Sequence, residues 1–136
     1  MTEPMTEKQL TAVWPIVRYT DARAAMRFLA DAFGFEVTAV HPAEGPVQHA
    51  ELRWPLGGGV MLGSQGQGDP IFAQNPQVGR SSVYVVTDEP DKLYARAVEA
   101  GAEIAREMRD EDYGSRGFTA RDPEGNVWSF GTYAGE

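Results

Sequence analysis

The hydrophobic positions of the chain form short strand-like runs and helical stripes, and the same order occurs twice. In the first half, Val13–Tyr19 is a short apolar run that predicts a strand. Thr20 or Asp21 then offers a side-chain oxygen to the free amides of a helix start, and Gly34 ends that helix in a left-handed cap. The apolar stripe of this helix consists of Ala25, Phe28, Leu29, Ala32 and Phe33. Three more strands are predicted, at Phe35–His41, Val47–Trp54 and Gly58–Ser64.

The second half repeats this order. Ser82–Thr87 predicts a strand, and Asp88 is the expected cap of a helix that tolerates Pro90 in its first turn. The inner stripe of this helix consists of Leu93, Ala97 and Ala100, and Gly101 closes it. Strands are predicted to follow at Glu103–Met108, Arg116–Arg121 and Asn126–Tyr133.

A constant offset of 67 residues relates the two halves, because it carries Gly34 onto Gly101, Glu36 onto Glu103, and Gly58 onto Gly125. These matches predict an α+β fold of two tandem βαβββ modules, about residues 13–64 and 81–133, joined by a linker at 65–80. Each half is only about 50 residues long and would leave one sheet face uncovered. We therefore expect a single domain over residues 1–136.

Charge and composition limit the kinds of partner and the cellular location that we expect for the protein. The chain carries a net charge of −8, whereas nucleic-acid phosphates require a basic surface, so we expect no nucleic-acid partner. There is no cysteine, which excludes disulfides and thiolate metal ligands. No apolar run approaches the ~20 residues of a membrane span, and the polar start lacks a signal peptide's apolar stretch. A cytoplasmic protein without a membrane partner is predicted.

Two stretches resemble the signature sequences of the vicinal oxygen chelate superfamily, namely WPIVRYTDARAAMRFLADAFGFE and YGSRGFTARDPEGNVWSFGTY. This superfamily includes glyoxalase I, extradiol dioxygenases, fosfomycin-resistance enzymes and bleomycin-resistance proteins. The DPEGN turn, Asp122–Asn126, is the most specific part of the match. The chain looks closest to the bleomycin-resistance branch, whose aromatic–Gly–Arg stretch is loosely matched by Tyr113–Arg116 with one residue inserted, and whose first-strand proline is matched by Pro15.

The resemblance implies curved mixed sheets around a cavity, with the helices outside. It also implies a homodimer in which an N-terminal arm crosses to the partner, and a small-molecule ligand at the dimer cleft. For the bleomycin-resistance branch, that ligand would be an antibiotic or another cationic or aromatic molecule, and no cofactor would be needed.

Enzymes of this superfamily hold a divalent metal on the first and last strands of each module, through His, Glu or occasionally Gln. The 67-residue offset places the first-strand positions at Trp14 or Pro15 and at Ser81 or Ser82. The last-strand positions fall on Leu62 and Ser129. None of these side chains is a normal ligand, so the sequence predicts that the metal site is absent.

His49 and Glu51 are two residues apart on one predicted strand, so both point to the same face. Two donors at this spacing could supply two ligands of a metal site, but the sequence shows no third ligand. The alternative is a polar strand face that lines a pocket.

Candidate ligand-binding residues follow from the same alternation. His49, Glu51 and Arg53 are expected on the concave face of one strand, with Ala50, Leu52 and Trp54 in the core. The equivalent strand is expected to add Arg116 and Phe118, and the last strand Ser129; the full candidate set is His49, Glu51, Arg53, Tyr113, Arg116, Phe118 and Ser129. The alternatives remain open: the arginines pair with surface acids, Phe118 belongs to the core or a dimer interface, and Tyr113 gates a cleft or closes the dimer.

Three functions are consistent with these residues. The first is a metal-independent binding protein that sequesters a small molecule at a dimer cleft. The second is a metal-dependent lyase, isomerase or dioxygenase with a non-standard site, which would need a third donor near His49 and Glu51. The third is a metal-free enzyme that uses His49 or Glu51 as a general base. We favour the first, because the metal positions lack donors.

Overall fold

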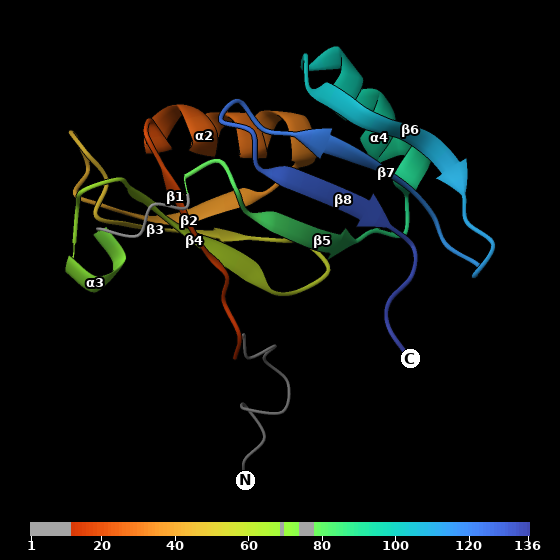
Figure 1. Ribbon diagram of the computed structural model, residues 1–136, viewed down its shortest axis with the longest axis horizontal. Helices are drawn as coiled ribbons and strands as arrows, with labels where there is room; N and C mark the ends of the chain where they lie inside the picture. Colours follow the sequence, from red (N-terminus) through yellow and green to blue (C-terminus); the bar gives the residue numbers. More distant parts are fainter. Residues whose placement is uncertain (1–11, 69, 74–77) are drawn as a thin grey trace, which may run out of the picture.

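Two four-stranded sheets, one from each half of the chain, form the frame of the molecule (Figure 1). The computed structural model describes residues 12–68, 70–73 and 78–136. Sheet A has the strand order β1-β4-β3-β2, with β1 parallel to β4 and the other neighbours antiparallel. Its strands are β1 (Ile16–Tyr19), β2 (Glu36–His41), β3 (His49–Arg53) and β4 (Gly59–Ser64).

Sheet B repeats this arrangement in the order β5-β8-β7-β6, again with the first pair parallel and the others antiparallel. Its strands are β5 (Ser82–Val86), β6 (Glu103–Asp110), β7 (Arg116–Arg121) and β8 (Val127–Gly131). The predicted α+β fold of two βαβββ modules is therefore confirmed.

One helix follows the first strand of each module. In the first module, α2 (Ala22–Phe28) continues into the π-helical turn η1 (Leu29–Phe33). In the second, α4 (Pro90–Glu99) takes the same place, and the stretch predicted as a linker contains the one-turn helix α3 (Pro70–Ala73). None of the helices in the described ranges is long and apolar enough to cross a membrane.

The start and end of α2–η1 follow the predicted signals. The Asp21 carboxylate accepts a hydrogen bond from the Ala24 amide at 3.0 Å, and Gly34 ends the helix with φ +92°. The predicted cap at Asp88 was wrong. Glu89 is the residue before α4, and the hydroxyl of Thr87 accepts its amide hydrogen at 3.1 Å.

The strands repeat at an offset of 68, one residue more than the helix ends. Ile16 pairs with Met61 in sheet A, and Tyr84 pairs with Ser129 at the equivalent place in sheet B. Two insertions explain the change. The π-helical turn gives the first helix one extra residue, and β6 makes two register shifts against β7 where β2 makes one against β3.

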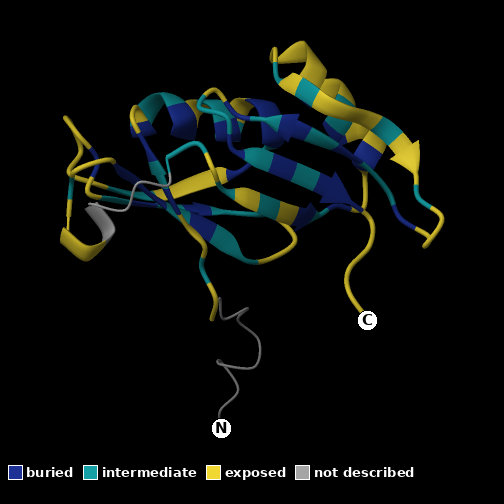
Figure 2. Ribbon diagram, in the orientation of Figure 1, coloured by how far each residue is buried: buried dark blue, intermediate teal, exposed yellow. Residues whose placement is uncertain are grey.

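Both sheets share one hydrophobic core, which the helices cover from above (Figure 2). Phe33, at the end of η1, packs against Phe130 and Trp128 of β8, with ring centroids 4.6 and 6.1 Å apart. Trp54, just after β3, packs against Phe130 at 5.8 Å, and its indole N–H donates to the carbonyl of Val86 at 2.8 Å. The two modules are therefore held together through their helix-facing sides.

The DPEGN turn adds a polar latch between the modules. The buried Asp122 carboxylate accepts hydrogen bonds from the Tyr19 hydroxyl at 2.6 Å and the Trp128 indole at 3.0 Å. The Glu124 carboxylate accepts the backbone amides of Thr20 and Asp21 at 2.6 and 2.7 Å. This signature turn thus holds the end of β1 and the start of α2.

Candidate functional site

Each sheet has one face on the core and one face turned away from the helices, which we call its open face (Figure 1). In sheet A, the core side chains include Val17, Ala50 and Leu62, each at most 2% exposed. In sheet B, Phe118 and Phe130 are equally buried. Because strand side chains alternate, the residues between these positions form the open faces.

Three predicted site residues lie on the open face of sheet A. His49 and Glu51 are joined by a 2.9 Å contact from Nε2 to the carboxylate, and both side chains are partly exposed. The guanidinium of Arg53 lies over the Trp14 ring, 4.8 Å from its centroid. His41 of β2 stacks beside His49, with centroids 6.5 Å apart and ring planes within 8°. The alternating pattern of β2 is broken by a bulge, so sequence reasoning missed this neighbour.

The placement of Arg116 and Phe118 on the concave side was wrong. Phe118 is 2% exposed and packs in the core between Tyr94 of α4 and Phe130, with ring centroids 5.1 and 5.2 Å away. The additional bulge on β6 accompanies a one-residue shift of the repeat, and a shift of one residue moves a side chain to the opposite face. Gly117 and Thr119 therefore occupy the open face instead.

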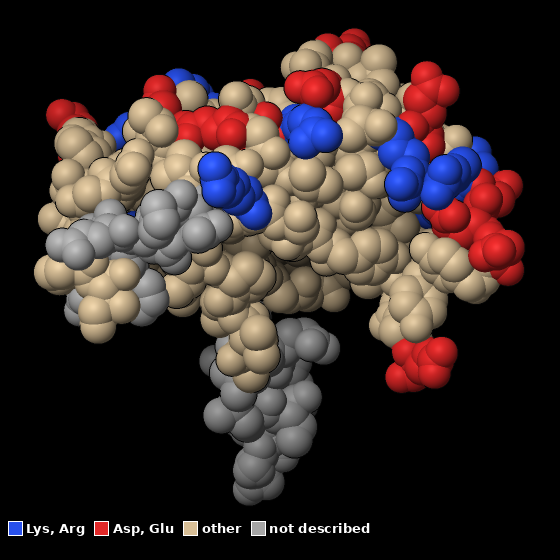
Figure 3. Space-filling view, in the orientation of Figure 1, with Lys and Arg blue, Asp and Glu red and all other residues tan. Residues whose placement is uncertain are grey.

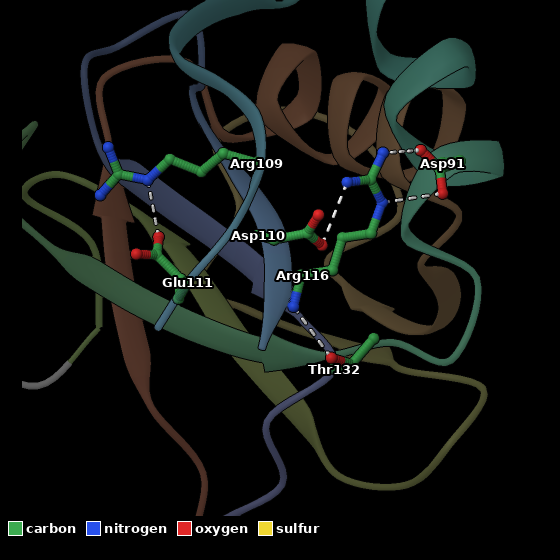
Figure 4. A network of polar contacts seen from close by, with 6 residues as sticks. All are labelled: Asp91, Arg109, Asp110, Glu111, Arg116 and Thr132. Carbon is green, nitrogen blue, oxygen red and sulfur yellow. Dashed lines mark hydrogen bonds and ion pairs between the residues drawn. The ribbon is translucent and has the colours of Figure 1, made fainter. Parts of the chain in front are cut away.

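Arg116 connects the start of β7 to α4 through ion pairs (Figure 4). Its Nη2 and Nε donate to the two carboxylate oxygens of Asp91 at 2.7 and 3.1 Å, and Nη1 donates to Asp110 at 3.2 Å. The hydrogen bond from Arg116 holds the pKa of the Asp91 carboxyl below its usual value. Pairing with surface acids, the alternative left open for this arginine, is what the structure contains.

Tyr113 and Ser129 meet at a small pocket of about 130 Å³ on the open face of sheet B. Tyr84 forms one wall, and its hydroxyl donates to the carbonyl of Tyr133 at 2.7 Å. The hydroxyls of Thr119 and Ser129 are 3.0 Å apart at the floor. Tyr84 was absent from the predicted set, although its alternate position on β5 would have placed it there.

Glycines give this pocket its depth. A Cβ at Gly131 would lie 2.8 Å from the Tyr84 hydroxyl and 3.0 Å from the hydroxyl of Ser115. A Cβ at Gly117 would overlap the carbonyl of Phe130. Both positions therefore require a residue without a side chain if the pocket is to keep its shape.

A larger groove of about 640 Å³ runs along the seam between the two sheets. None of its lining residues is charged, and Figure 3 shows the lower central surface, over β4 and β5, as largely free of charged side chains. Several apolar side chains around it remain strongly exposed, among them Val13 at 83% and Leu56 at 54%. Tyr84 lines both this groove and the small pocket.

A family model described as Glyoxalase/Bleomycin resistance protein/Dioxygenase superfamily matches residues 11–130. The chain belongs to this superfamily. Among solved structures, TioX from Micromonospora sp. ML1 is similar with a TM-score of 0.77 and 29% identity, over 90% of this chain and 100% of that one. A glyoxalase/bleomycin resistance protein from Catenulispora acidiphila DSM 44928 has a TM-score of 0.65 and 22% identity, over 90% and 97%. UcmS2 has a TM-score of 0.67 and 18% identity, over 91% and 100%. No curated protein matches the sequence.

The superfamily's metal does not fit the residues present here. In the corrected register, Leu62 is a core residue and Met61 is the counterpart of Ser129. The open-face positions of β1, β4, β5 and β8 are Ile16, Arg18, Gly59, Met61, Gly63, Ser82, Tyr84, Val86, Val127, Ser129 and Gly131. No imidazole or carboxylate occurs among them. The described part of the chain also contains no group of three His, Cys, Asp or Glu side chains arranged to hold an ion.

Proposed function

We propose that this superfamily member binds a small organic molecule without a metal ion, on the open face of sheet B, within a homodimer. One observation carries the proposal. Where metal enzymes of the superfamily need imidazole and carboxylate donors, the four relevant strands present tyrosine, serine, glycine and apolar side chains and one arginine, Arg18. Such a surface fits a ligand recognised by ring contacts and hydroxyl hydrogen bonds.

The pocket on sheet B favours a flat aromatic ligand. Tyr84 and Tyr113 stand at its sides, 48% and 62% exposed, and leave ring surface for stacking. The Thr119–Ser129 hydroxyl pair at the floor supplies one donor and several acceptors that fix orientation. Natural ligand sites combine these elements, an apolar or aromatic wall and a few placed polar groups.

The size of the pocket supports the dimer. Its volume of about 130 Å³ is well below the roughly 300 Å³ at which pockets enclose a drug-sized molecule. A second wall is needed, and the exposed apolar rim of the seam groove, including Leu56 and Val13, gives a partner subunit a surface to cover. We place the ligand where the two subunits meet.

The likeness to a bleomycin resistance protein and the network of exposed tyrosines support an antibiotic-like ligand that the protein sequesters. The net charge of −8 favours a ligand that carries positive charge in addition to its ring system.

A thermal-shift scan tests this function. Purified protein is heated with bleomycin-type antibiotics, smaller aromatic drugs, and divalent metals, each with and without EDTA. A binder at about 100 times its Kd adds roughly 2.7 kcal/mol to the free energy of unfolding. We expect shifts from aromatic compounds that survive EDTA and vanish in Tyr84→Ala but not in Val98→Ala, a control on the exposed side of α4. Shifts that require Ni²⁺, Zn²⁺, Mn²⁺ or Fe²⁺ would contradict the proposal.

A metal-dependent lyase, isomerase or dioxygenase remains the second candidate because His49, Glu51 and the neighbouring His41 share one sheet. In this arrangement, Glu51 already occupies the Nε2 atom of His49. If the second candidate holds, His49→Ala abolishes a metal-induced shift, whereas under our proposal there is no such shift to abolish.

A further inference from the structure

Arg18 is a cation on the open face of sheet A that the predicted site did not include. It lies in the middle of β1, between the buried Val17 and Tyr19, and pairs in register with Gly63 of β4. Its side chain therefore crosses the open face towards β3 rather than entering the core. His49 lies on the same face, two strands away across β4.

The guanidinium has no partner within the part of the chain that the structure describes. Its Nε is buried and forms no hydrogen bond, and none of the ion pairs among the described residues includes Arg18. Two other arginines, by contrast, donate to backbone carbonyls: Arg23 to those of Pro42 and Gly45, and Arg96 to those of Ala30 and Asp31. Leaving a buried charged donor unsatisfied is costly, so an unpaired guanidinium calls for a reason.

Glycines make room for this side chain. A Cβ at Gly63 would overlap the Nη1 atom of Arg18, and a Cβ at Gly68 would come within 3.8 Å of Nη2. Gly63 does not need to be glycine for its backbone conformation, because its φ is not positive. The absence of a side chain at Gly63 thus leaves room for the Arg18 guanidinium beside it.

We propose that Arg18 anchors an anionic group, a carboxylate or phosphate, on the open face of sheet A. A guanidinium presents a planar fork of N–H donors that matches two oxygens of such a group. The terminal Nη1 and Nη2 atoms of Arg18 would donate to these oxygens, whereas the buried Nε is out of the anion's reach. The carboxylate of Glu51, on the open face of β3, is 2.9 Å from Nε2 of His49 and is therefore already paired.

This inference deepens the proposed function and rests on it, since it assigns the open faces as the ligand surface. It adds a negatively charged group, carried by the ligand or by a separate small anion, to the positively charged aromatic ligand proposed for sheet B. The anion could belong to the ligand or be free inorganic phosphate, and both would use the same fork.

Nuclear magnetic resonance with inorganic phosphate, acetate and benzoate tests the proposal on the full chain. We expect each anion to shift the Arg18 Nε–H resonance, and phosphate to raise the unfolding temperature. Arg18→Met should lose this response, with affinity reduced about tenfold or more. Gly63→Ala should lose it as well, because the added Cβ displaces the guanidinium while the charge remains. Arg27→Met, which removes an exposed arginine from α2, should keep it.

Stability without anions separates a binding role from a structural one. If Arg18 is kept for an anion, Arg18→Met should unfold at the same temperature as the parent protein or higher, since it removes an unsatisfied buried group. A clear loss of stability, or anion responses unchanged in Arg18→Met and Gly63→Ala, would overturn the proposal. Benzoate alone acting through Arg18 would assign the anion to an aromatic ligand, and phosphate acting equally would assign a separate anion. A failure of neutral aromatic compounds to bind would count only against the proposed function.

Discussion

At the scale of single residues, the DPEGN turn owes its specificity to the hydrogen bonds it makes. Asp122 is 4% exposed and accepts from a tyrosine hydroxyl, an indole, the Asn126 side-chain amide and two backbone amides. The Asn126 side chain also accepts the Ser81 amide at 2.9 Å. The residues of the turn that resemble a family signature are therefore structural, and they join β1, β5 and β8.

Replacing Asp122 tests this role. Asp122→Ala leaves several buried donors without an acceptor, so we expect the free energy of unfolding to fall by about 3 kcal/mol or more. Urea denaturation measures this change. Asp112→Ala, which removes an exposed carboxylate from a loop, is the matched control and should have little effect. If both variants lost the same free energy of unfolding, Asp122 would not have the structural role assigned to it.

The hydrogen bond between Tyr19 and Asp122 makes the stability of the fold depend on pH. Burial, and next the negative charge of Asp122, raise the pKa of the Tyr19 hydroxyl far above its ordinary value. The folded protein therefore keeps this proton when the unfolded chain has lost it, and stability falls as the pH rises above about 10.

Comparison with Tyr19→Phe isolates that contribution. Below pH ~9 we expect the variant to be less stable by about 1 kcal/mol, owing to the lost hydrogen bond. Above pH ~10 the parent protein should lose stability faster, so the gap between the two narrows. Chemical denaturation at a series of pH values measures the gap, and a gap that widens in alkali would contradict the assignment.

At the scale of elements, sequence periodicity located the strands and both helices, because β-branched runs, the Asp21 cap and the Gly34 terminator act locally. It failed where an insertion changed the register. A π-helical turn and an extra β-bulge have no clear sequence signal, yet the first lowers the repeat offset from 68 to 67 before Gly34, and the second restores 68 before β7. The open-face residues of β3 were therefore correct, while Phe118 was assigned to the wrong face.

Phe118 and Arg116 should respond differently to truncation. Phe118→Ala empties a core position between Tyr94 and Phe130, so we expect a loss of about 3–5 kcal/mol in the free energy of unfolding. Arg116→Ala removes only exposed ion pairs and should have a small effect on stability. The Arg116→Ala variant should bind the ligand as tightly as the parent protein does. Loss of binding would show that Arg116 belongs to the ligand site.

At the scale of the whole molecule, the two modules meet through their helix-facing sides and leave their open faces uncovered. An apolar seam between them carries exposed Leu56 and Val13. Such a surface is costly in water, and a second subunit is the covering that the proposed ligand cleft requires.

Sedimentation velocity tests the dimer. We expect the sedimentation of the parent protein to correspond to twice the mass of one chain. Leu56→Asp places a charge in the apolar seam and should shift the equilibrium towards the monomer. Val98→Asp, at a similarly exposed position on α4, should leave the dimer intact. A parent protein that is monomeric at high concentration would contradict the two-walled cleft.

The most direct measurement for the function is a calorimetric titration of the tightest-binding aromatic compound into protein treated with EDTA. The titration is then repeated after Ni²⁺, Zn²⁺, Mn²⁺ or Fe²⁺ is added in excess of EDTA. We expect the same Kd under every condition, and its loss in Tyr84→Ala. Binding that disappears in EDTA and returns with one metal would contradict a metal-independent site and turn the assignment towards an enzyme that uses His49 and Glu51.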